Sequence, residues 1–286
     1  MVIRDLLNES ILKINEAHKE ERAAYELLKK HLKIENYQLY LMLEEEVDKA
    51  VIDDYNQDLN DYLDNKPLQY ILGYEMFLGR DFIVNDKVLI PRYETEELVE
   101  NILYHIDDYF SDYEQIDIVD IGCGSGAIAI SLDLEDNKTK VIGSDISSDA
   151  LSVATHNNEL LKAEVTFKQG DMLQPLIDNN IKVDILVSNP PYIPDEELLE
   201  NSVKDYEPHV ALFGGNQGLD FYEIILKNAH LVIKERALLA FEIGYNQKDG
   251  LINLINKYFK DASYQILKDI NGKDRMLFIY HNLINK

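Results

Sequence analysis

The sequence predicts an α/β protein in two parts: a small N-terminal helical bundle, then a mainly parallel sheet with helices on both faces. Three observations predict this fold class. The first 66 of the 286 residues contain neither glycine nor proline, short apolar stretches then alternate with longer amphipathic ones, and a glycine-rich segment follows the first of those stretches. Hydrophobic residues make up 46% of the chain, so there is enough apolar material for a core.

The distribution of helix breakers sets the boundary of the first part. All seven prolines lie at or after Pro67 and all 13 glycines at or after Gly73. In a helix interior these residues cost about 3 and 1 kcal/mol relative to alanine. Their absence predicts helices throughout the segment, and polar residues near Asn8, His18 and Lys33 predict breaks that divide it into several short helices.

The next segment predicts a connector made of strands. Aromatic and β-branched runs in residues 74–93 are interrupted at Gly79 and Asn85, which is typical of a β-hairpin. Thr95, followed by two glutamates, then predicts the start of a helix, because a threonine side chain can cap the first turn and acidic residues suit its dipole.

From there the chain alternates candidate strands and helices, which predicts βα units and a parallel sheet. The strands are expected at Ile116–Ile121, Lys140–Ser144, Glu164–Lys168, Val183–Ser188 and Ala237–Ile243, with helices such as Ala127–Leu134 and Asp149–Leu161 between them. Two further strands, Tyr264–Leu267 and Met276–His281, are joined by the turn sequence Asn271-Gly272 and predict an antiparallel pair.

The composition excludes several classes of function. Asp and Glu number 53 against 28 Lys and Arg, a net charge of −25, which disfavours sequence-independent nucleic-acid binding and docking on anionic membranes. The single cysteine excludes an internal disulfide and fits a reducing compartment. Acidic residues at positions 5 and 9 do not suit a signal peptide, so we expect a cytoplasmic protein. The seven histidines show no paired ligand spacing, so no metal is expected.

A glycine loop indicates a nucleoside-containing ligand. Gly122, Gly124 and Gly126 follow the first predicted strand, where they allow a tight turn and a close approach of the backbone to a ligand. Asp145 ends the next strand, where a carboxylate can accept both ribose hydroxyls. The spacing differs from the dinucleotide fingerprint, and the adjacent Asp120 suits a cationic ligand better than a pyrophosphate. The loop therefore favours S-adenosylmethionine, with NAD as the alternative.

The second motif, Asn189-Pro190-Pro191-Tyr192, follows a strand expected to be buried. The prolines end the strand and stiffen its rim, which carries two acceptors, the side-chain carbonyl of Asn189 and the backbone carbonyl of Pro190. Two such acceptors can hold a planar NH₂ group with its nitrogen facing a methyl donor, while Tyr192 offers an aromatic surface. The motif therefore predicts methyl transfer to an amide or arylamine nitrogen.

Two residues have two interpretations each. Cys123 is a candidate nucleophile, but no partner base is identifiable nearby, and a small residue that fills the loop is the favoured interpretation. Glu242 ends a predicted central strand and is either structural or part of the pocket.

Taken together, the motifs resemble the HemK/PrmC family, the protein-(glutamine-N5) methyltransferases that modify peptide chain release factors. The resemblance covers nearly the whole chain, and its markers are Pro67–Gly73, Leu89–Glu96, Asp120–Gly126, Asp145, Gly170-Asp171, Ser188–Ile193, Tyr206–Pro208, Ala211–Gly215 and Glu242–Gly244. Two positions depart from the family pattern: Tyr93 replaces a common proline, and Met172 stands where an aromatic residue is frequent.

The resemblance implies a class I S-adenosylmethionine-dependent methyltransferase fold, Rossmann-like, with a mainly parallel seven-stranded sheet and an antiparallel C-terminal strand. It implies a helical substrate-recognition domain at residues 1–73, a β-hairpin linker at 74–93 and a catalytic domain at 94–286. The reaction would be methyl transfer from S-adenosylmethionine to the glutamine of a Gly-Gly-Gln motif in release factors, leaving S-adenosylhomocysteine.

The resemblance also implies roles for individual residues. Cofactor binding is expected at Gly122, Cys123, Gly124, Ser125, Gly126, Asp145, Asp171, Met172 and Asn189. The catalytic residues would be Asn189, Pro190 and Tyr192, and the substrate would contact these together with Pro191, Arg92 and Glu94. The alternatives are a ribosomal-protein glutamine methyltransferase, an adenine methyltransferase of nucleic acid, which the charge disfavours, and a non-catalytic binding protein.

Overall fold

The computed structural model describes residues 1–197 and 200–283, which form two compact units. The first unit comprises Met1–Tyr74 together with the later helix α10 (Asn201–Tyr206). The second unit comprises the rest of the described chain from Glu75 onward. Among the described residues, no helix is both long enough and apolar enough to span a membrane.

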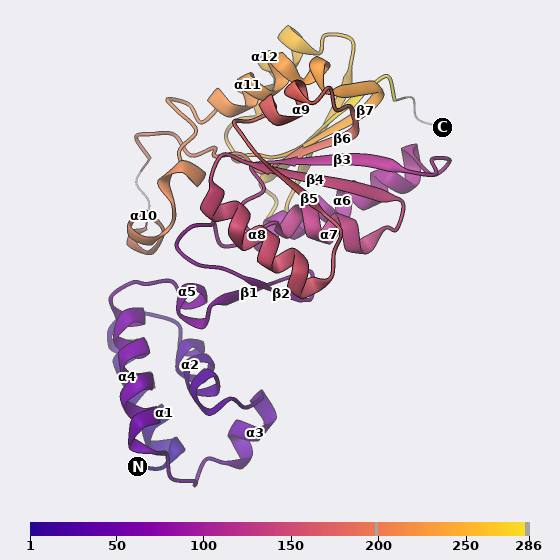
Figure 1. Cartoon of the computed structure of the whole chain (residues 1–286). Helices are drawn as coiled ribbons and strands as arrows, with labels where there is room; N and C mark the ends of the chain where they lie inside the picture. Colours follow the sequence, from indigo (N-terminus) through magenta and orange to yellow (C-terminus); the bar gives the residue numbers. More distant parts are fainter. Residues whose placement is uncertain (198–199, 284–286) are drawn as a thin grey trace. The chain divides into compact units, whose positions relative to one another are not determined.

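The first unit is a helical bundle, as predicted (Figure 1). Its other helices are α1 (Ile3–Glu16), α2 (Arg22–Leu32), α3 (Asn36–Leu41), α4 (Lys49–Leu63) and α5 (Leu68–Leu72). Breaks occur near His18 and Lys33, which both adopt left-handed backbone conformations. The break expected at Asn8 is wrong, because Asn8 lies on the exposed face of α1, where a polar residue leaves the helix intact.

The helix α10 was not expected in this unit. Its Tyr206 hydroxyl donates a hydrogen bond to the backbone carbonyl of Asp64 at 3.1 Å, 142 positions away in the sequence. No local pattern indicates such a long-range grouping.

The hairpin consists of β1 (Tyr74–Phe77) and β2 (Arg80–Ile83). Phe77 and Phe82 are buried in the core of the second unit, with their rings edge to face at 5.9 Å. The side chain of Asn157 exchanges two hydrogen bonds with the backbone of Ile83, at 2.8 and 3.0 Å. The hairpin from Glu75 onward is therefore built into the second unit and is not a free connector.

The second unit contains the predicted seven-stranded sheet, with strand order β5-β4-β3-β6-β7-β9-β8. Its strands are β3 (Ile116–Ile121), β4 (Thr139–Asp145), β5 (Thr166–Gln169), β6 (Val183–Ser188), β7 (Ile233–Glu242), β8 (Ser263–Lys268) and β9 (Asp274–His281). The first five are parallel, whereas β9 runs antiparallel to β7 and β8 antiparallel to β9.

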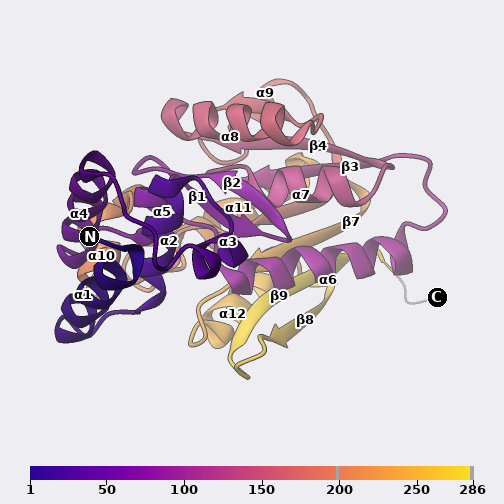
Figure 2. The same ribbon diagram turned by 90° about the horizontal axis from the view of Figure 1, so that it is seen from below.

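Helices cover both faces of the sheet (Figure 1). One face carries α6 (Tyr93–Tyr109), α7 (Ala127–Glu135) and α8 (Ser148–Leu161), which lie side by side when seen from below (Figure 2). The other carries α9 (Gln174–Asp178), α11 (Asp220–Asn228) and α12 (Lys248–Tyr258), and short 3₁₀ helices occupy His209–Ala211 and Ala229–Leu231. Along β3, Ile118 faces one core and Val119 the other, which explains its nearly continuous apolar sequence.

The helix expected to begin at Thr95 begins earlier, at Tyr93, and the expectation that Thr95 caps it is wrong. The cap position is Arg92, and Thr95 is buried inside the first turn. Its hydroxyl is engaged with the carboxyl group of Glu242, 147 positions away, at 2.5 Å. A tertiary partner thus takes the hydroxyl that local sequence assigns to the cap.

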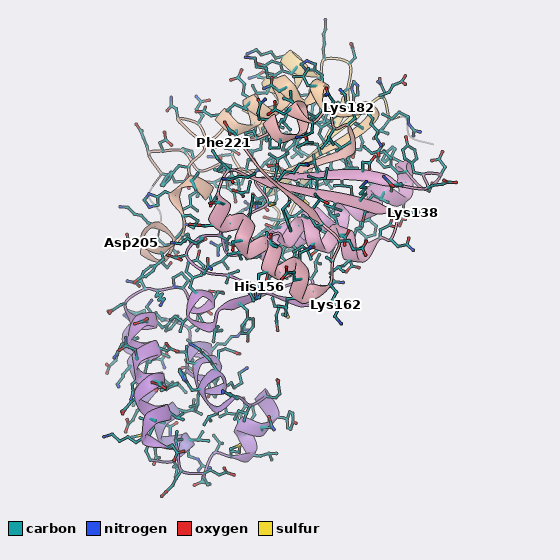
Figure 3. All side chains as sticks on the ribbon, viewed as in Figure 1. Lys138, His156, Lys162, Lys182, Asp205 and Phe221 are labelled. Carbon is teal, nitrogen blue, oxygen red and sulfur yellow. The ribbon has the colours of Figure 1, made fainter. Side chains whose placement is uncertain are left out.

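The order of the parallel strands places a crevice between β3 and β6. The chain runs outward from β3 to β4 and β5, and then returns to place β6 on the opposite side of β3. In sheets of this kind, ligands bind at the carboxyl ends of the strands where the order reverses. Figure 3 shows Phe221 at that end of the sheet, opposite Lys138 and Lys182, which precede β4 and β6.

Candidate active site

A cavity opens at the carboxyl ends of β3, β4 and β6. Its wall includes seven residues that the sequence predicted for the site: Gly122, Gly124, Asp145, Asp171, Met172, Asn189 and Pro191. They come from three loops and the last position of β4, so the fold alone brings them together.

The loop after β3 depends on its glycines. Gly122, Gly124 and Gly126 all have positive φ, at +72°, +53° and +82°. The backbone N–H groups of Gly122 and Cys123 both donate to the carbonyl of Ser144, at 2.8 and 2.9 Å, which ties the loop to the end of β4. The loop can therefore approach a ligand without Cβ atoms in the way.

Asp145 is held by two backbone donors at the end of β4. Its Oδ2 accepts from the N–H of Gly124 and its Oδ1 from the N–H of Ser147, both at 2.9 Å. Each carboxylate oxygen can accept a further hydrogen bond, and Asp145 lines the cavity. The carboxylate is therefore positioned to accept hydroxyl donors of a ligand.

Asp120 lies fully buried behind this loop. Neither of its carboxyl oxygens has a hydrogen-bond partner in the part of the chain that the structure describes. Burial, together with the nearby charge of Asp145, raises the pKa of the Asp120 carboxyl to about 8, although the nearby backbone N–H of Ala129 opposes the shift. Without a ligand this carboxyl group therefore holds its proton at neutral pH; a cation beside the loop would favour its ionised form, whereas a phosphate would oppose ionisation.

Three residues predicted for cofactor binding, Cys123, Ser125 and Gly126, are absent from the lining of the cavity. Cys123 is buried, and its Sγ would lie 3.2 Å from a Cβ on Gly143. Burial and the charges of Asp120 and Asp145 raise the pKa of this thiol, which keeps it protonated. These properties are those of a small residue filling the loop, because a nucleophile needs the thiolate.

The Asn-Pro-Pro-Tyr segment is held in place through its backbone. A Cβ on Gly214 would lie 2.3 Å from the carbonyl oxygen of Pro191, and one on Gly218 would lie 2.0 Å from that of Tyr192. The side-chain amide of Gln247 also donates to the carbonyl of Tyr192 at 2.9 Å. Only glycine permits this close approach, which fixes the strand-terminal rim.

Asn189 belongs to a polar cluster beside the cavity, in which Thr95 and Glu242 are buried and Asn189 and Tyr192 are partly buried. Its Nδ2 donates to Thr95 Oγ1 at 3.3 Å, and the Thr95 hydroxyl in turn bonds to Glu242 Oε2 at 2.5 Å. Tyr192 donates its hydroxyl to Glu242 Oε1 at 3.2 Å. Burial raises the pKa of Glu242, although these hydrogen bonds and the charge of Arg275 oppose the shift.

Arg92 and Glu94, predicted to contact substrate, lie outside the wall of the cavity, as do Pro190 and Tyr192. The Arg92 guanidinium pairs with the buried carboxylate of Glu207 at 2.5 Å, and Glu207 also accepts from the N–H of Ile90 at 3.4 Å. Glu207 therefore links its own segment to the segment that contains Ile90 and Arg92, and both segments carry wall residues of the cavity.

Sequence reasoning assigned no role to several apolar wall residues, among them Val88, Leu89, Val210, Ala211 and Phe221. They lie mostly in segments without strand or helix periodicity. Leu89 and Ala211 fall inside blocks that resemble the family, which was the only indication of their position.

Comparison with known proteins identifies the family. Residues 5–73 match the PrmC N-terminal domain and residues 100–205 match the methyltransferase small domain. The chain is 44% identical to the release factor glutamine methyltransferase of Bacillus subtilis, over 92% of each chain. It is 41% identical to that of Bacillus cereus, over 93% of this chain and 94% of that one.

The chain belongs to the release factor glutamine methyltransferase family. Among solved structures, the T. thermophilus 16S rRNA N2 G1207 methyltransferase RsmC, in complex with AdoMet and guanosine, is 14% identical with a TM-score of 0.52. That match covers 73% of this chain and 50% of the other, and it shows a shared methyltransferase fold.

In this family member, Gly218→Ala is expected to lower the free energy of unfolding more than Gly272→Ala does. Both glycines have positive φ, at +68° and +77°, so each substitution strains the backbone by about 1–3 kcal/mol. Only Gly218 adds a collision with Tyr192, because a Cβ on Gly272 meets no atom within 4 Å. Denaturant titration of both variants measures the difference, and equal losses would contradict the packing argument.

Asp120→Asn is expected to stabilise the ligand-free protein increasingly as pH rises. The folded carboxyl holds its proton up to about pH 8, whereas the unfolded one releases it near 3.8. Wild-type stability from this group is therefore present at low pH and is lost between those values.

The measurement for Asp120→Asn is the difference in free energy of unfolding between variant and wild type, from pH 5 to about pH 8. Asp81→Asn, which removes one exposed carboxylate, controls for the lost charge. A difference that does not change with pH would show that Asp120 is ionised throughout.

Proposed function

We propose that this protein transfers a methyl group from S-adenosylmethionine to the side-chain amide nitrogen (N5) of the glutamine in the Gly-Gly-Gln motif of peptide chain release factors. One observation carries the proposal. Asn189 lines the same cavity as Gly122, Gly124 and Asp145, so a holder for an amide and a cradle for a nucleoside share one space. The names of the related Bacillus proteins support the substrate.

The cavity suits S-adenosylmethionine by charge and shape. Asp145, and Asp120 once a bound cation releases its proton, would favour a ligand that carries an ammonium and a sulfonium and no phosphate. Asp145 would accept the ribose hydroxyls, and Asp171 and Met172, which line the wall, would lie beside the adenine. When bound, this cofactor supplies the electrophilic methyl group. The RsmC structure, which contains AdoMet on a related fold, supports the assignment.

The chain's own contribution to the reaction is orientation. Asn189 Oδ1 and the carbonyl of Pro190 would each accept one N–H of the glutamine amide, which turns its nitrogen toward the methyl donor. An amide nitrogen is a weak nucleophile because its lone pair is delocalised. The same two acceptors stabilise the positive charge that develops on that nitrogen. A strong base is not needed, since an N-methylated cationic amide loses its proton readily.

The remaining predicted residues have supporting roles. Tyr192 and Pro191 shape the rim at which the glutamine enters, and Arg92, tied to Glu207, holds the neighbouring wall with Glu94 beside it. We assign substrate recognition to the helical unit, residues 1–73, which matches the PrmC N-terminal domain. Because release factors act at the ribosome, we place the reaction in the cytoplasm.

The direct test is transfer of labelled methyl from S-adenosylmethionine to a purified release factor. Label is expected in the wild-type factor and absent after Gln→Ala in its Gly-Gly-Gln motif. A ribosomal protein assayed in parallel distinguishes the closest alternative. Label that survives Gln→Ala, or that appears only in the ribosomal protein, would overturn the proposal.

Asn189→Ala is expected to lower kcat by about 10²–10³-fold, because one of two fixed acceptors is lost where charge develops. Asn137→Ala, in an exposed turn, is the matched control. Single-turnover methylation measures the chemical step. An Asn189→Ala enzyme with wild-type kcat would exclude the proposed holding of the amide.

The substrate KM is expected to rise with salt. The chain carries −25, and a release-factor loop that approaches RNA would be basic, so association gains from opposite charges. Such attraction is screened as the Debye length falls from about 10 Å at 0.1 M to about 3 Å at 1 M salt. A KM independent of salt over this range would contradict electrostatic steering.

A further inference from the structure

Three side chains from different parts of the second unit form a hydrogen-bonded cluster with Asn189. Thr95 comes from the first turn of α6, Glu242 from the end of β7, and Tyr192 from the loop after β6. Thr95 and Glu242 are 4% and 1% exposed. The holding of the amide described above uses Asn189 Oδ1 and the carbonyl of Pro190, and it leaves the buried Thr95 and Glu242 without a role.

The hydrogen bonds of this cluster have a direction. Each carboxylate oxygen of Glu242 accepts one hydrogen bond, Oε1 from the Tyr192 hydroxyl at 3.2 Å and Oε2 from the Thr95 hydroxyl at 2.5 Å. A threonine hydroxyl has only one proton to donate. Because this proton is already in the hydrogen bond to Glu242, the Thr95 oxygen can only accept a further hydrogen bond. It accepts one from Asn189 Nδ2 at 3.3 Å.

This direction decides which end of the Asn189 amide reaches the cavity. With Nδ2 turned to Thr95, no hydrogen bond among the described residues uses the carbonyl oxygen Oδ1, and Asn189 lines the cavity. An amide group has nearly the same shape when rotated by 180°, so packing alone does not distinguish the two orientations. The rotated form would present NH₂ to the NH₂ of the substrate, two donors facing each other.

We propose that Thr95 and Glu242 are positioning residues that hold the Asn189 amide with its acceptor oxygen toward the substrate nitrogen. The inference rests on the proposed function and deepens it. It makes the selection of a glutamine amide over a carboxylate depend on a hydroxyl that does not touch the substrate.

The surroundings of Glu242 are consistent with a fixed acceptor. Tyr222 donates its hydroxyl to the backbone carbonyl of Glu242 at 2.7 Å, which anchors the end of β7. Arg275 on β9 provides the nearby positive charge, and Glu94 on α6 the negative one. The carboxylate is therefore held by donors on both oxygens and by its own backbone.

The first experiment compares Thr95→Val, which keeps the shape but removes the hydroxyl, with Thr95→Ser, which keeps the hydroxyl. Thr95→Val is expected to lower kcat for release-factor methylation by about tenfold or more. Without the hydroxyl, the Asn189 amide can rotate by 180° and turn its NH₂ group toward the NH₂ group of the substrate, two donors facing each other. Thr95→Ser is expected to stay within about threefold of wild type. Equal activity of Val and Ser variants would overturn the proposal.

The second readout separates positioning from a merely structural role. Binding of the release factor is measured in the presence of S-adenosylhomocysteine, with the Gly-Gly-Gln motif intact and with Gln→Glu. Wild type is expected to prefer the amide, since Asn189 Oδ1 accepts from NH₂ and repels a carboxylate. Thr95→Val is expected to reduce this preference. A variant that loses kcat but keeps the wild-type preference would show that Thr95 only supports the fold.

Glu242→Gln tests the other member of the chain. If Glu242 acts through Thr95, the double variant with Thr95→Val should lose no more kcat than the larger single loss. Full activity of Glu242→Gln, or a loss of kcat in the double variant equal to the two single losses combined, would show that Glu242 does not act through Thr95.

The outcome for wild type keeps the two proposals apart. If wild type methylates the release factor and Thr95→Val has the same kcat as wild type, only the positioning role of Thr95 and Glu242 would be overturned. Absence of methylation by wild type would overturn the proposed function and this inference with it.

Discussion

The reversal of strand order beside β3 is the constraint on which the site depends. With β4 on one side and β6 on the other, the chain leaves the carboxyl ends of these strands in different directions and a crevice opens between them. The glycine loop and Asn189 come directly after β3 and β6, and Asp145 is the last residue of β4. Their meeting in one cavity therefore follows from topology, before any side chain makes a contact.

Rigidity at this crevice comes from backbone-level contacts. Gly214 and Gly218 approach the carbonyls of Pro191 and Tyr192 so closely that no side chain fits between. The side chain of Gln247 donates to the carbonyl of Tyr192 in the same segment, and the Arg92–Glu207 pair joins two segments that carry wall residues of the cavity. A site that works by orienting a weak nucleophile needs this stiffness, because misplacement by a fraction of an ångström reduces the advantage of proximity.

Charge has two scales in this protein. Over the whole chain, −25 acts at long range and is screened by salt. Within the cavity, Asp120 lacks a hydrogen-bond partner among the described residues, and its raised pKa is a local cost in stability at neutral pH. Local instability of this kind is typical of a binding site, where a ligand of the right charge compensates for it.

The sequence by itself determined the features that local sterics control. Glycines mark the turn after β3 and prolines end β6. Mainly apolar, β-branched stretches identify Ile116–Ile121 and Val183–Ser188 as strands, with the bounds the structure shows. The tertiary structure alone decided the partners of polar side chains. Thr95, locally a cap, bonds Glu242 instead, and Tyr206 joins the first unit through Asp64. A local sequence pattern predicts interactions between residues within one helical turn or one strand, whereas these contacts join residues more than 140 positions apart.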